Sequence, residues 1–592
     1  LTSLRFVEEG QEIRILPESA QFGSRGLTVE LPKSAGLSGP ARAIRYRPDS
    51  IVASLLQNGV RISGELIDFS CEEFRLSVDS GEKEPADWIN TALSLTLMLE
   101  REGKLLYSAD CSICAEEAAG RNRRLSVRPN QTNIPRFPAK EYRSARHLMD
   151  LCPMLQFMHP LTGAPSSFKI TELSGTGFAV REPAHDSRLI PGLILPEAKM
   201  VFADRKSIQM SLQLIYRQEA AEEGYVRCGI AILDIAPDEH LSILALLHQD
   251  NHPDAYLSST ISIDDLWRFF FTSGFIYPRK YQYLHSYKDS LKKTYEKLYN
   301  GESDIARHFV VQRDNAILGH LSMVRFYDKT WLIHHHASAV TGGGSAGLRV
   351  LQQIGHYANE SHRFRRMNLK FLMCYYRPEN KFPAKVFGGL APFVGDSQLC
   401  SVDPCALFHA RSGSKSSDKL PALFTLDDMS GEDYAQLSAG YSRFSGGMML
   451  EAMNLPPIGG PDEGNRAVEE SFRDLGIERS VRARALRKNG RLVAALILNS
   501  ADPGINLSEL TNSISMIVLD SESLNSDIVQ TVCGELAGNF ATPSVPVLMY
   551  PQETADTLSI PVDRVYHLWV MRMTISDHYF RHLNGYLRNV ES

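Results

Sequence analysis

The sequence predicts a multidomain protein in which two all-β modules precede two modules that combine α-helices with β-strands. The chain has 592 residues, enough for several domains. The first 250 residues or so are mostly short alternating runs broken by glycine turns, a pattern typical of antiparallel strands. In the remainder, segments with helical spacing alternate with strand-like runs, and that order occurs twice.

Two polar linkers and the change of pattern set the predicted domain boundaries. The first linker contains Pro253, and the second reads RSGSKSSDK. The predicted domains are 1–130, 131–250, 260–410 and 420–592.

Composition narrows the class of protein. The formal charge of −6 argues against broad nucleic-acid binding, although a local patch can still be basic. No apolar run of about 18 residues occurs, so we expect no membrane span. No signal-peptide pattern is visible, although the chain begins with Leu1. The odd number of cysteines, 9, favours reduced thiols and a cytoplasmic location.

The first two modules share one plan. Residues 51–78 form alternating runs around the turn signal Asn58-Gly59, and residues 153–180 again read as two strands around a glycine turn. Cys111 and Cys114 are a lone CxxC pair that no second pair completes, so neither a zinc site nor a redox pair is expected there.

In the second module, Glu172-Leu173-Ser174-Gly175-Thr176-Gly177 resembles the Asp/Asn-x-Ser-x-x-Gly signature of PilZ domains. The run Arg143-Ser144-Ala145-Arg146 resembles their other signature, an Arg-x-x-x-Arg loop. PilZ domains are bacterial barrels that bind cyclic di-GMP. The resemblance therefore implies a cyclic di-GMP site, and guanidinium groups suit its phosphates and guanine edges. The implied ligand-binding residues are Arg143, Arg146, Glu172, Ser174 and Gly177.

Some positions depart from the PilZ pattern. Tyr142 stands where the first arginine belongs, and Glu172 replaces Asp or Asn. In the first module Glu73 stands at the glycine position, where its charge would repel a phosphate, so we expect that module to be structural. The alternative for the second module is a solvated linker that carries Arg143 and Arg146, next to a plain hairpin turn.

The third module centres on a strand, a glycine turn and a helix. Trp331–Val340 is strand-like, and residues 347–359 have helical spacing. A turn of this kind brings backbone N–H groups close to a phosphate at a helix N-terminus. The alternative is a surface loop with no ligand. The candidate phosphate-binding residues are Gly342, Gly343, Gly344 and Ala346.

The order of elements resembles the acyl-CoA N-acyltransferases of the GNAT superfamily. Their Gln/Arg-x-x-Gly-x-Gly/Ala loop, which holds the CoA pyrophosphate, is matched here at Gly344 and Ala346. Asn380 matches an Asn that lies near the CoA arm in that family. Phe387 stands where the family often has a Tyr as general acid, and Phe has no proton to donate. Tyr375 or Tyr376 is the candidate replacement.

Three consecutive histidines precede the glycine turn. On a regular strand His334 and His336 would share one face and His335 would take the other. No carboxylate at ligand spacing completes a metal site, so we expect no metal. His336 is the candidate general base, and structural histidines are the alternative.

The fourth module repeats the third. Residues 482–498 form a hairpin around Asn489-Gly490, and Ser513–Leu519 matches the strand before the glycine turn. Asp520-Ser521-Glu522-Ser523 stands at the turn, and its acidic residues would repel a pyrophosphate. We interpret this module as a degenerate GNAT-like copy.

Together these resemblances imply a bacterial protein whose PilZ-like barrel senses cyclic di-GMP and regulates an N-acyltransferase unit. That unit would use acyl-CoA or an acyl carrier as donor. The alternative is a non-catalytic cyclic di-GMP receptor that acts through a protein partner, with structural GNAT-like domains. A scaffold in which both ligand sites are relics is the third interpretation.

Overall fold

The computed structural model divides the described residues into two compact units. The first comprises residues 1–139 and 145–235, and the second comprises residues 140–144 and 236–592. The structure describes all residues except 1–3, 9–10, 16–18, 24–25, 33–35, 41–43, 80–88, 120–121, 132, 135–139, 144–145, 149–151, 203–205, 221–223, 250–254, 257–260, 279–280, 282–283, 301–302, 314–315, 340–345, 412–419, 456–461, 503–504 and 592. Most of both predicted linkers therefore lies outside the described residues.

Short strands precede the first barrel. Strands β1, β2 and β5 form a small antiparallel sheet, and β3 pairs with β4. Their bounds are β1 (Leu4–Glu8), β2 (Gln11–Ile15), β3 (Ser19–Gly23), β4 (Gly26–Glu30) and β5 (Gly36–Pro40).

The first barrel is a closed ring of six strands in the order β10-β11-β8-β7-β6-β9. Its inward positions alternate with exposed ones, as the period-2 pattern predicts, and Cys111 is buried while Cys114 is exposed. The strands are β6 (Val52–Gln57), β7 (Val60–Phe69), β8 (Phe74–Asp79), β9 (Leu95–Arg101), β10 (Lys104–Ala119) and β11 (Asn122–Pro129).

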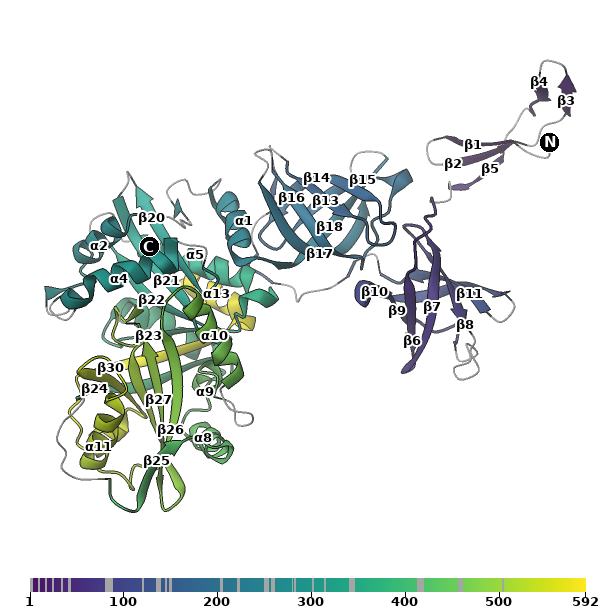
Figure 1. Cartoon of the computed structure of the whole chain (residues 1–592). Helices are drawn as coiled ribbons and strands as arrows, with labels where there is room; N and C mark the ends of the chain where they lie inside the picture. The colour runs from purple at the N-terminus through teal and green to yellow at the C-terminus, as the bar shows by residue number, and fades with distance from the viewer. Residues whose placement is uncertain are drawn as a thin grey trace. The chain divides into compact units, whose positions relative to one another are not determined.

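The second barrel also closes with six strands, because β14 pairs with both β13 and β15 at the ends of the series β14-β13-β16-β17-β18-β15. The short strand β12 adds to its side by pairing with β14. Figure 1 shows the strands curving around its core. The strands are β12 (His147–Leu148), β13 (Met154–Met158), β14 (Pro165–Ser174), β15 (Gly177–Pro183), β16 (Ile194–Val201), β17 (Ser207–Glu219) and β18 (Tyr225–Ile235).

The second unit is built on one sheet of 12 strands in the order β19-β20-β21-β22-β23-β30-β24-β29-β28-β27-β26-β25. The strands are β19 (Ala255–Tyr256), β20 (Ala306–Arg313), β21 (Ala316–Tyr327), β22 (Thr330–Ser338), β23 (Phe371–Tyr376), β24 (Cys400–Arg411), β25 (Phe424–Asp428), β26 (Arg479–Lys488), β27 (Arg491–Ala501), β28 (Ser513–Val518), β29 (Ser544–Tyr550) and β30 (Arg564–Arg572).

Helices lie between the strands of the second unit and at both ends of its strand series. They are α1 (Pro237–Gln249), α2 (Ile263–Thr272), α4 (Lys288–Tyr295), α5 (Ala346–Ser361), α6 (Lys381–Pro383), α7 (Leu390–Val394), α8 (Gly431–Phe444), α9 (Met449–Ala452), α10 (Asp462–Asp474), α11 (Ser526–Ala537), α12 (Glu553–Thr557) and α13 (Ser576–Glu591). Helix α1 belongs to the second unit, and the hydroxyl of Ser361 on α5 is 3.2 Å from Nδ1 of its His240.

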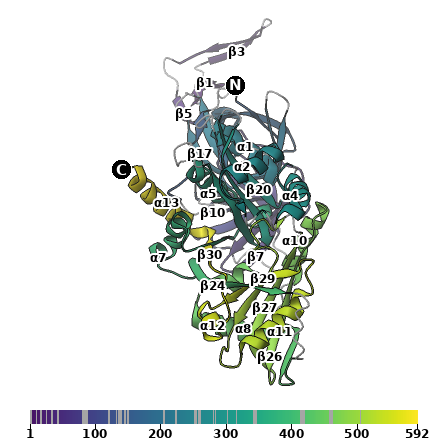
Figure 2. The same ribbon diagram turned by 90° about the vertical axis from the view of Figure 1, so that its left-hand side faces the viewer.

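The second unit contains two copies of one plan. We call β19–β24 the first repeat and β25–β30 the second repeat. In each, three antiparallel strands lead through a helix to a parallel strand: β22 pairs in parallel with β23, and β28 with β29. Figure 2 shows the strands and helices of the second repeat together in green to yellow. Two all-β barrels followed by tandem α+β domains are the fold class that the sequence predicts.

The two repeats exchange their last strands. The last strand of the first repeat, β24, pairs with β29, and the last strand of the second repeat, β30, pairs with β23. The two exchanged strands also pair with each other. Each repeat therefore completes the sheet of the other, and apolar side chains of both pack in a common cluster.

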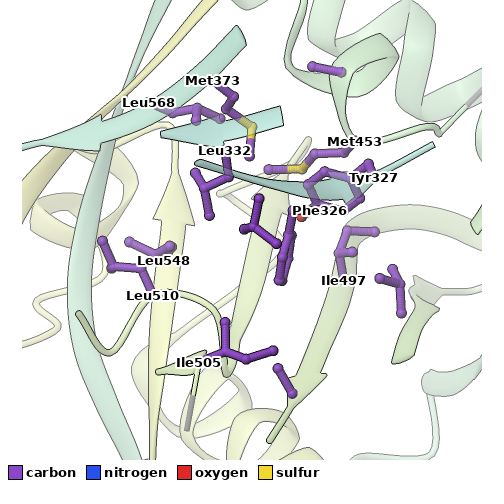
Figure 3. Close-up of a cluster of buried hydrophobic side chains, with 14 of the residues drawn as sticks. Phe326, Tyr327, Leu332, Met373, Met453, Ile497, Ile505, Leu510, Leu548 and Leu568 are labelled. Carbon is purple, nitrogen blue, oxygen red and sulfur yellow. The ribbon is translucent and has the colours of Figure 1, made fainter. Parts of the chain in front are cut away.

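Figure 3 shows part of that shared core, with side chains from both repeats directed at one another. The labelled residues include Leu332 and Met373 of the first repeat and Ile497 and Leu548 of the second. All four side chains are buried. Burying apolar area on both sides stabilises the pair by about 25 cal/mol for each Å² removed from water, so neither repeat is expected to fold alone.

No helix in the described part of the chain is both long and apolar enough to cross a membrane.

Candidate functional site

A cavity of about 510 Å³ lies where two parallel strands of the first repeat separate. Strands β22 and β23 pair only from Thr330 to Leu332 on the β22 side, although β22 continues to Ser338. The gap beyond the pairing is lined by both strands and by residues of the second repeat. A slot between separated parallel strands exposes edge backbone groups, which suits an extended ligand.

A β-bulge shapes the wall formed by β22. The register with β21 shifts between His320 and Ser322, and His335 has a φ of 54°. The side chains of β21 hold this conformation. His320 Nδ1 lies 3.1 Å from the His335 carbonyl oxygen, to which it donates, and the hydroxyl of Ser322 donates to the His334 carbonyl over 3.1 Å.

The bulge overturns the predicted alternation of the three histidines. His334 and His335 stack on each other, with ring centroids 3.8 Å apart, because the extra residue turns the chain out of the two-residue repeat. The hydroxyl of Tyr299 is 2.9 Å from His334 Nε2, and the hydroxyl of Tyr295 contacts His335 Nδ1. Burial lowers the pKa of His334 to about 3 and that of His320 to about 4, so both rings are neutral at pH 7.

The clustered histidines His320, His334 and His335 do not form a recognisable metal site. No group of three or more His, Cys, Asp or Glu side chains in the described part of the chain could hold a metal ion.

His336 lies on the other side of β22, against helix α5. Its Nε2 is 2.9 Å from the Gly347 carbonyl oxygen, and its ring lies beside Phe382. Since a carbonyl only accepts, Nε2 carries the proton and Nδ1 keeps a free lone pair. Burial lowers the pKa of His336, so the neutral imidazole is available as a base at pH 7.

The start of α5 packs unusually close to the sheet. A Cβ on Gly319 would lie 2.8 Å from the Ala346 carbonyl oxygen, and a Cβ on Gly347 would lie 3.0 Å from Cβ of Ser338. These two glycines therefore bring the first turn of α5, whose N–H groups have no partner within the helix, next to the gap between β22 and β23. Of the predicted phosphate-binding residues, Ala346 is the first residue of α5, whereas Gly342, Gly343 and Gly344 lie outside the described residues.

The other residues predicted for this site, Asn380, Tyr375 and Phe387, all line the cavity. Asn380 lines the cavity, just before α6. Tyr375 lines it too, and burial raises the pKa of its hydroxyl well above the usual range. Phe387 is buried in the cavity wall.

The second repeat differs at the corresponding place. Strand β28 is buried along its whole length and pairs with β27 without a register shift. Its turn is closed by its own side chains, because Asp520 accepts a hydrogen bond from the Ser523 hydroxyl over 2.7 Å.

Two arginines and a tyrosine gather on the second barrel. The guanidinium groups of Arg146 and Arg227 lie 6.0 and 5.6 Å from the Tyr216 ring centroid. Glu172 contacts both arginines, at 2.6 Å from Arg227 and 3.8 Å from Arg146. The side chain of Arg146 is 49% exposed, so the cluster is open to a ligand. Glu172 neutralises the charge that a phosphate would need.

The predicted turn residues of this barrel have structural partners. The Ser174 hydroxyl donates to the Gly177 carbonyl over 2.8 Å. A Cβ on Gly177 would lie 2.4 Å from the Ile230 carbonyl oxygen, so the glycine allows β15 and β18 to approach. Arg143 is exposed and belongs to the second unit, whereas Arg146 belongs to the first.

In the first barrel, the charged side chains at the corresponding turn pair with one another. Arg45 forms ion pairs with Asp68 and with Glu73, the second at 2.6 Å. The Ser70 hydroxyl accepts hydrogen bonds from the backbone N–H groups of Glu72 and Glu73. Arg45 is therefore already paired and is not available to a phosphate.

The residues just before Arg143 are anchored within the second unit. Lys140 Nζ donates to Asn359 Oδ1 over 2.5 Å and to the Ser576 hydroxyl over 3.0 Å. Asp577 accepts hydrogen bonds from the backbone N–H groups of Glu141 and Tyr142. This segment therefore joins the C-terminal end of α5 to the start of α13.

Sequence reasoning missed the parts of these sites that come from distant segments. Arg227 and Tyr216 lie on β18 and β17, while Arg564 and Glu509 of the second repeat line the cavity of the first. No local motif marks these residues, because only the pairing of strands brings them together.

No protein-family model matches the chain, and no curated protein matches it. The solved structures that match are of two kinds. The K. pneumonia MrkH–c-di-GMP complex is 14% identical over 34% of this chain and 88% of its own, with a TM-score of 0.17. YcgR from Escherichia coli in complex with c-di-GMP is 13% identical over 34% of this chain and 84% of its own, with a TM-score of 0.17. A GCN5-related N-acetyltransferase from Sphaerobacter thermophilus is 11% identical over 48% of this chain and 85% of its own, with a TM-score of 0.28.

Proposed function

We propose that this protein is an N-acyltransferase whose activity responds to cyclic di-GMP. The cavity between β22 and β23, at the start of α5, is the observation that carries the proposal. The donor is acyl-CoA or an acyl carrier, and the acceptor is an amine.

The donor would enter beside α5. The backbone N–H groups at the start of α5 and in the glycine turn would hold its pyrophosphate, and Asn380 would contact its arm. The separated strands would take the extended arm, and the bulge at His335 frees one residue of β22 from the ladder to orient the thioester.

The chemistry is acyl transfer to nitrogen. The amine nitrogen bonds to the thioester carbonyl carbon, the carbon–sulfur bond breaks, and an amide and a thiol result. His336 is the proposed base, because Nδ1 has a free lone pair while Nε2 donates to Gly347. One proton of the ammonium passes to the base, and a second ends on the thiol that leaves. Tyr375 is the proposed acid for the leaving thiolate, and burial keeps its hydroxyl protonated.

Cyclic di-GMP would bind the second barrel at Arg146, with Glu172, Ser174 and Gly177 beside it. The exposed guanidinium and the Tyr216 ring support this, since phosphates pair with arginine and bases stack on aromatic rings. Arg143, which follows the anchored residues 140–142, would also contact the ligand.

The effect of cyclic di-GMP on acyl transfer would be transmitted through residues 140–143. Lys140 contacts Asn359 on α5, the helix whose other end begins at the donor site. A ligand that binds Arg143 would act on residues 140–142 and so on α5. Coupling of this kind requires two distinct sites and a measured effect of one on the other.

The test is acyl transfer with purified full-length protein, acetyl-CoA and a panel of amines, with and without cyclic di-GMP, read as release of free CoA thiol. The proposal predicts amine-dependent thiol release whose rate changes when cyclic di-GMP is added. Thiol release that never depends on the amine would contradict acyl transfer. A rate that ignores cyclic di-GMP, in protein that binds it, would contradict the regulation.

A second candidate is a non-catalytic cyclic di-GMP receptor. Phe387 at the position of the usual acid favours it, because Phe has no proton to offer a leaving thiolate. Burial also raises the pKa of Tyr375 well above the usual range, which makes that hydroxyl a weak acid. In that case the assay would show cyclic di-GMP binding and no transfer.

A further inference from the structure

Charged side chains of both signs gather at one end of the cavity. Arg564 and Glu509 come from the second repeat, and Arg377 follows β23 of the first. Tyr566 lines the same cavity, and burial raises the pKa of its hydroxyl. The rest of the cavity is lined largely by apolar and histidine side chains.

Neither Arg564 nor Glu509 forms an ion pair with any residue that the structure describes, and the guanidinium of Arg564 donates to the Tyr277 hydroxyl over 3.0 Å. Tyrosine hydroxyls leave a guanidinium with its full charge and with donors to spare. Half-buried charges without partners are costly unless a ligand completes them.

Glu509 is held in place by a rigid loop. Its φ of 66° is in the left-handed region, which costs about 1 kcal/mol or more for a non-glycine residue and is common at functional sites. Buried Asn506 fixes the loop, because its Oδ1 accepts hydrogen bonds from the N–H groups of Thr511 and Asn512, both over 3.2 Å. The carboxylate is therefore presented by a fixed backbone.

These charges lie on the face of the sheet opposite the proposed donor entrance. Neighbouring residues of β21 point to opposite faces: Gly319 faces α5, and the His320 ring meets Phe270 of α2 with centroids 5.3 Å apart. Arg564 bonds to Tyr277, which follows α2, so it is on the α2 side. The α5 side would then receive the donor and the α2 side the charged head of the acceptor, whose nitrogen would meet the thioester and His336 in the gap between β22 and β23.

We infer that the acceptor is an amine that also carries a carboxylate, an amino-acid-like head group, and that the second repeat supplies the residues that select it. Arg564, assisted by Arg377, binds the carboxylate through its guanidinium fork. Glu509 binds the ammonium before it loses its proton. The inference rests on the proposed acyl transfer. It gives the second repeat a role in acceptor specificity, although its own turn at Asp520–Ser523 is closed to a ligand.

The experiment compares matched acceptors with full-length protein. Each proteinogenic L-amino acid is tested against its own carboxamide, with acetyl-CoA as donor and free CoA thiol as readout. The two members of a pair differ only in the carboxylate. The same pairs are run with Arg564→Gln, with Glu509→Gln, and with Arg491→Gln as the control, since Arg491 is an exposed arginine of the second repeat outside the cavity.

The inference predicts at least a tenfold preference in kcat/KM for the acid over the amide. Arg564→Gln should reduce that preference at least tenfold, mainly through KM. Glu509→Gln should raise KM for both members, and Arg491→Gln should change nothing. Calorimetry with acetyl-CoA, run on every variant, checks that donor binding is intact.

Each result decides the question. Equal use of acids and amides, or a preference that survives Arg564→Gln, overturns the inference while acyl transfer stands. Protein that binds acetyl-CoA but acylates no amino acid also overturns it. Protein that neither binds acetyl-CoA nor transfers an acyl group overturns the proposed function, and the inference with it.

Discussion

His336 Nε2 lies 2.9 Å from the carbonyl oxygen of Gly347, which ties the bulged strand β22 to the first turn of α5. The bond fixes the tautomer of the imidazole and sets the place where the helix begins. It therefore links the proposed base to the proposed donor site.

His336→Gln separates those two roles. The glutamine amide can still donate to Gly347, but it accepts no proton at this pH. If His336 is the base, kcat should fall about 100-fold to 10,000-fold with KM for acetyl-CoA unchanged. In the unmutated protein the rate should fall as the pH drops through the lowered pKa of His336, below its ordinary 6.5. A raised KM with an unchanged kcat would instead assign His336 a positioning role.

Glu172→Gln should strengthen cyclic di-GMP binding to the second barrel. Glu172 pairs with Arg227 and Arg146, and its charge opposes an incoming phosphate. Removing the charge should lower Kd about tenfold, which corresponds to about 1.4 kcal/mol. Arg146→Ala should abolish saturable binding in the same calorimetric titration. Glu73→Gln in the first barrel is the matched control and should have no effect, because Arg45 already occupies that turn. Weaker binding by Glu172→Gln would show that Glu172 serves the ligand.

Lys140→Met should uncouple the two proposed sites. Lys140 is anchored to Asn359 and Ser576, and burial lowers its pKa to about 8. The variant should bind cyclic di-GMP and acetyl-CoA with unchanged Kd, while the ligand no longer alters the transfer rate. Glu141→Gln keeps the Lys140 contacts and serves as the control. Regulation that persists in Lys140→Met would rule out this segment as the route.

Buried neutral histidines should make the protein sensitive to acid. The folded pKa values of His334 and His320 are about 3 and about 4, whereas an unfolded histidine titrates near 6.5. Below pH 6.5 the unfolded chain therefore binds protons that the folded chain does not, and stability falls by about 1.4 kcal/mol per pH unit for each group. Melting temperatures measured from pH 7.5 to 5.0 should decline, and His320→Gln should make the decline shallower. An unchanged slope would contradict this account.

The sequence was a good guide to local structure and a poor guide to long-range pairing. Period-2 runs and Asn-Gly turns predicted strands such as β6 and β7, and helical spacing predicted α5, because these signals lie within a few residues. The exchange of β24 and β30 left no local signal, since it depends on pairing between segments more than 100 residues apart. His335 shows the same limit on a smaller scale. Its bulge is stabilised by His320 and Ser322 on the neighbouring strand, so alternation along β22 alone assigned the histidine faces wrongly.

The acyl-CoA site between β22 and β23 is tested most directly by a calorimetric titration of acetyl-CoA into the full-length protein and, in parallel, into Gly344→Asp. The substitution places a carboxylate in the glycine turn, as Asp520 does in the turn of the second repeat. Gly431→Asp is the control, since Gly431 is exposed at the start of α8, has no positive φ, and a Cβ there meets no atom within 4 Å. We expect saturable binding that is lost in Gly344→Asp and kept in Gly431→Asp. Absence of binding up to about a millimolar, a free energy weaker than about −4 kcal/mol, would contradict an acyl-CoA site between β22 and β23.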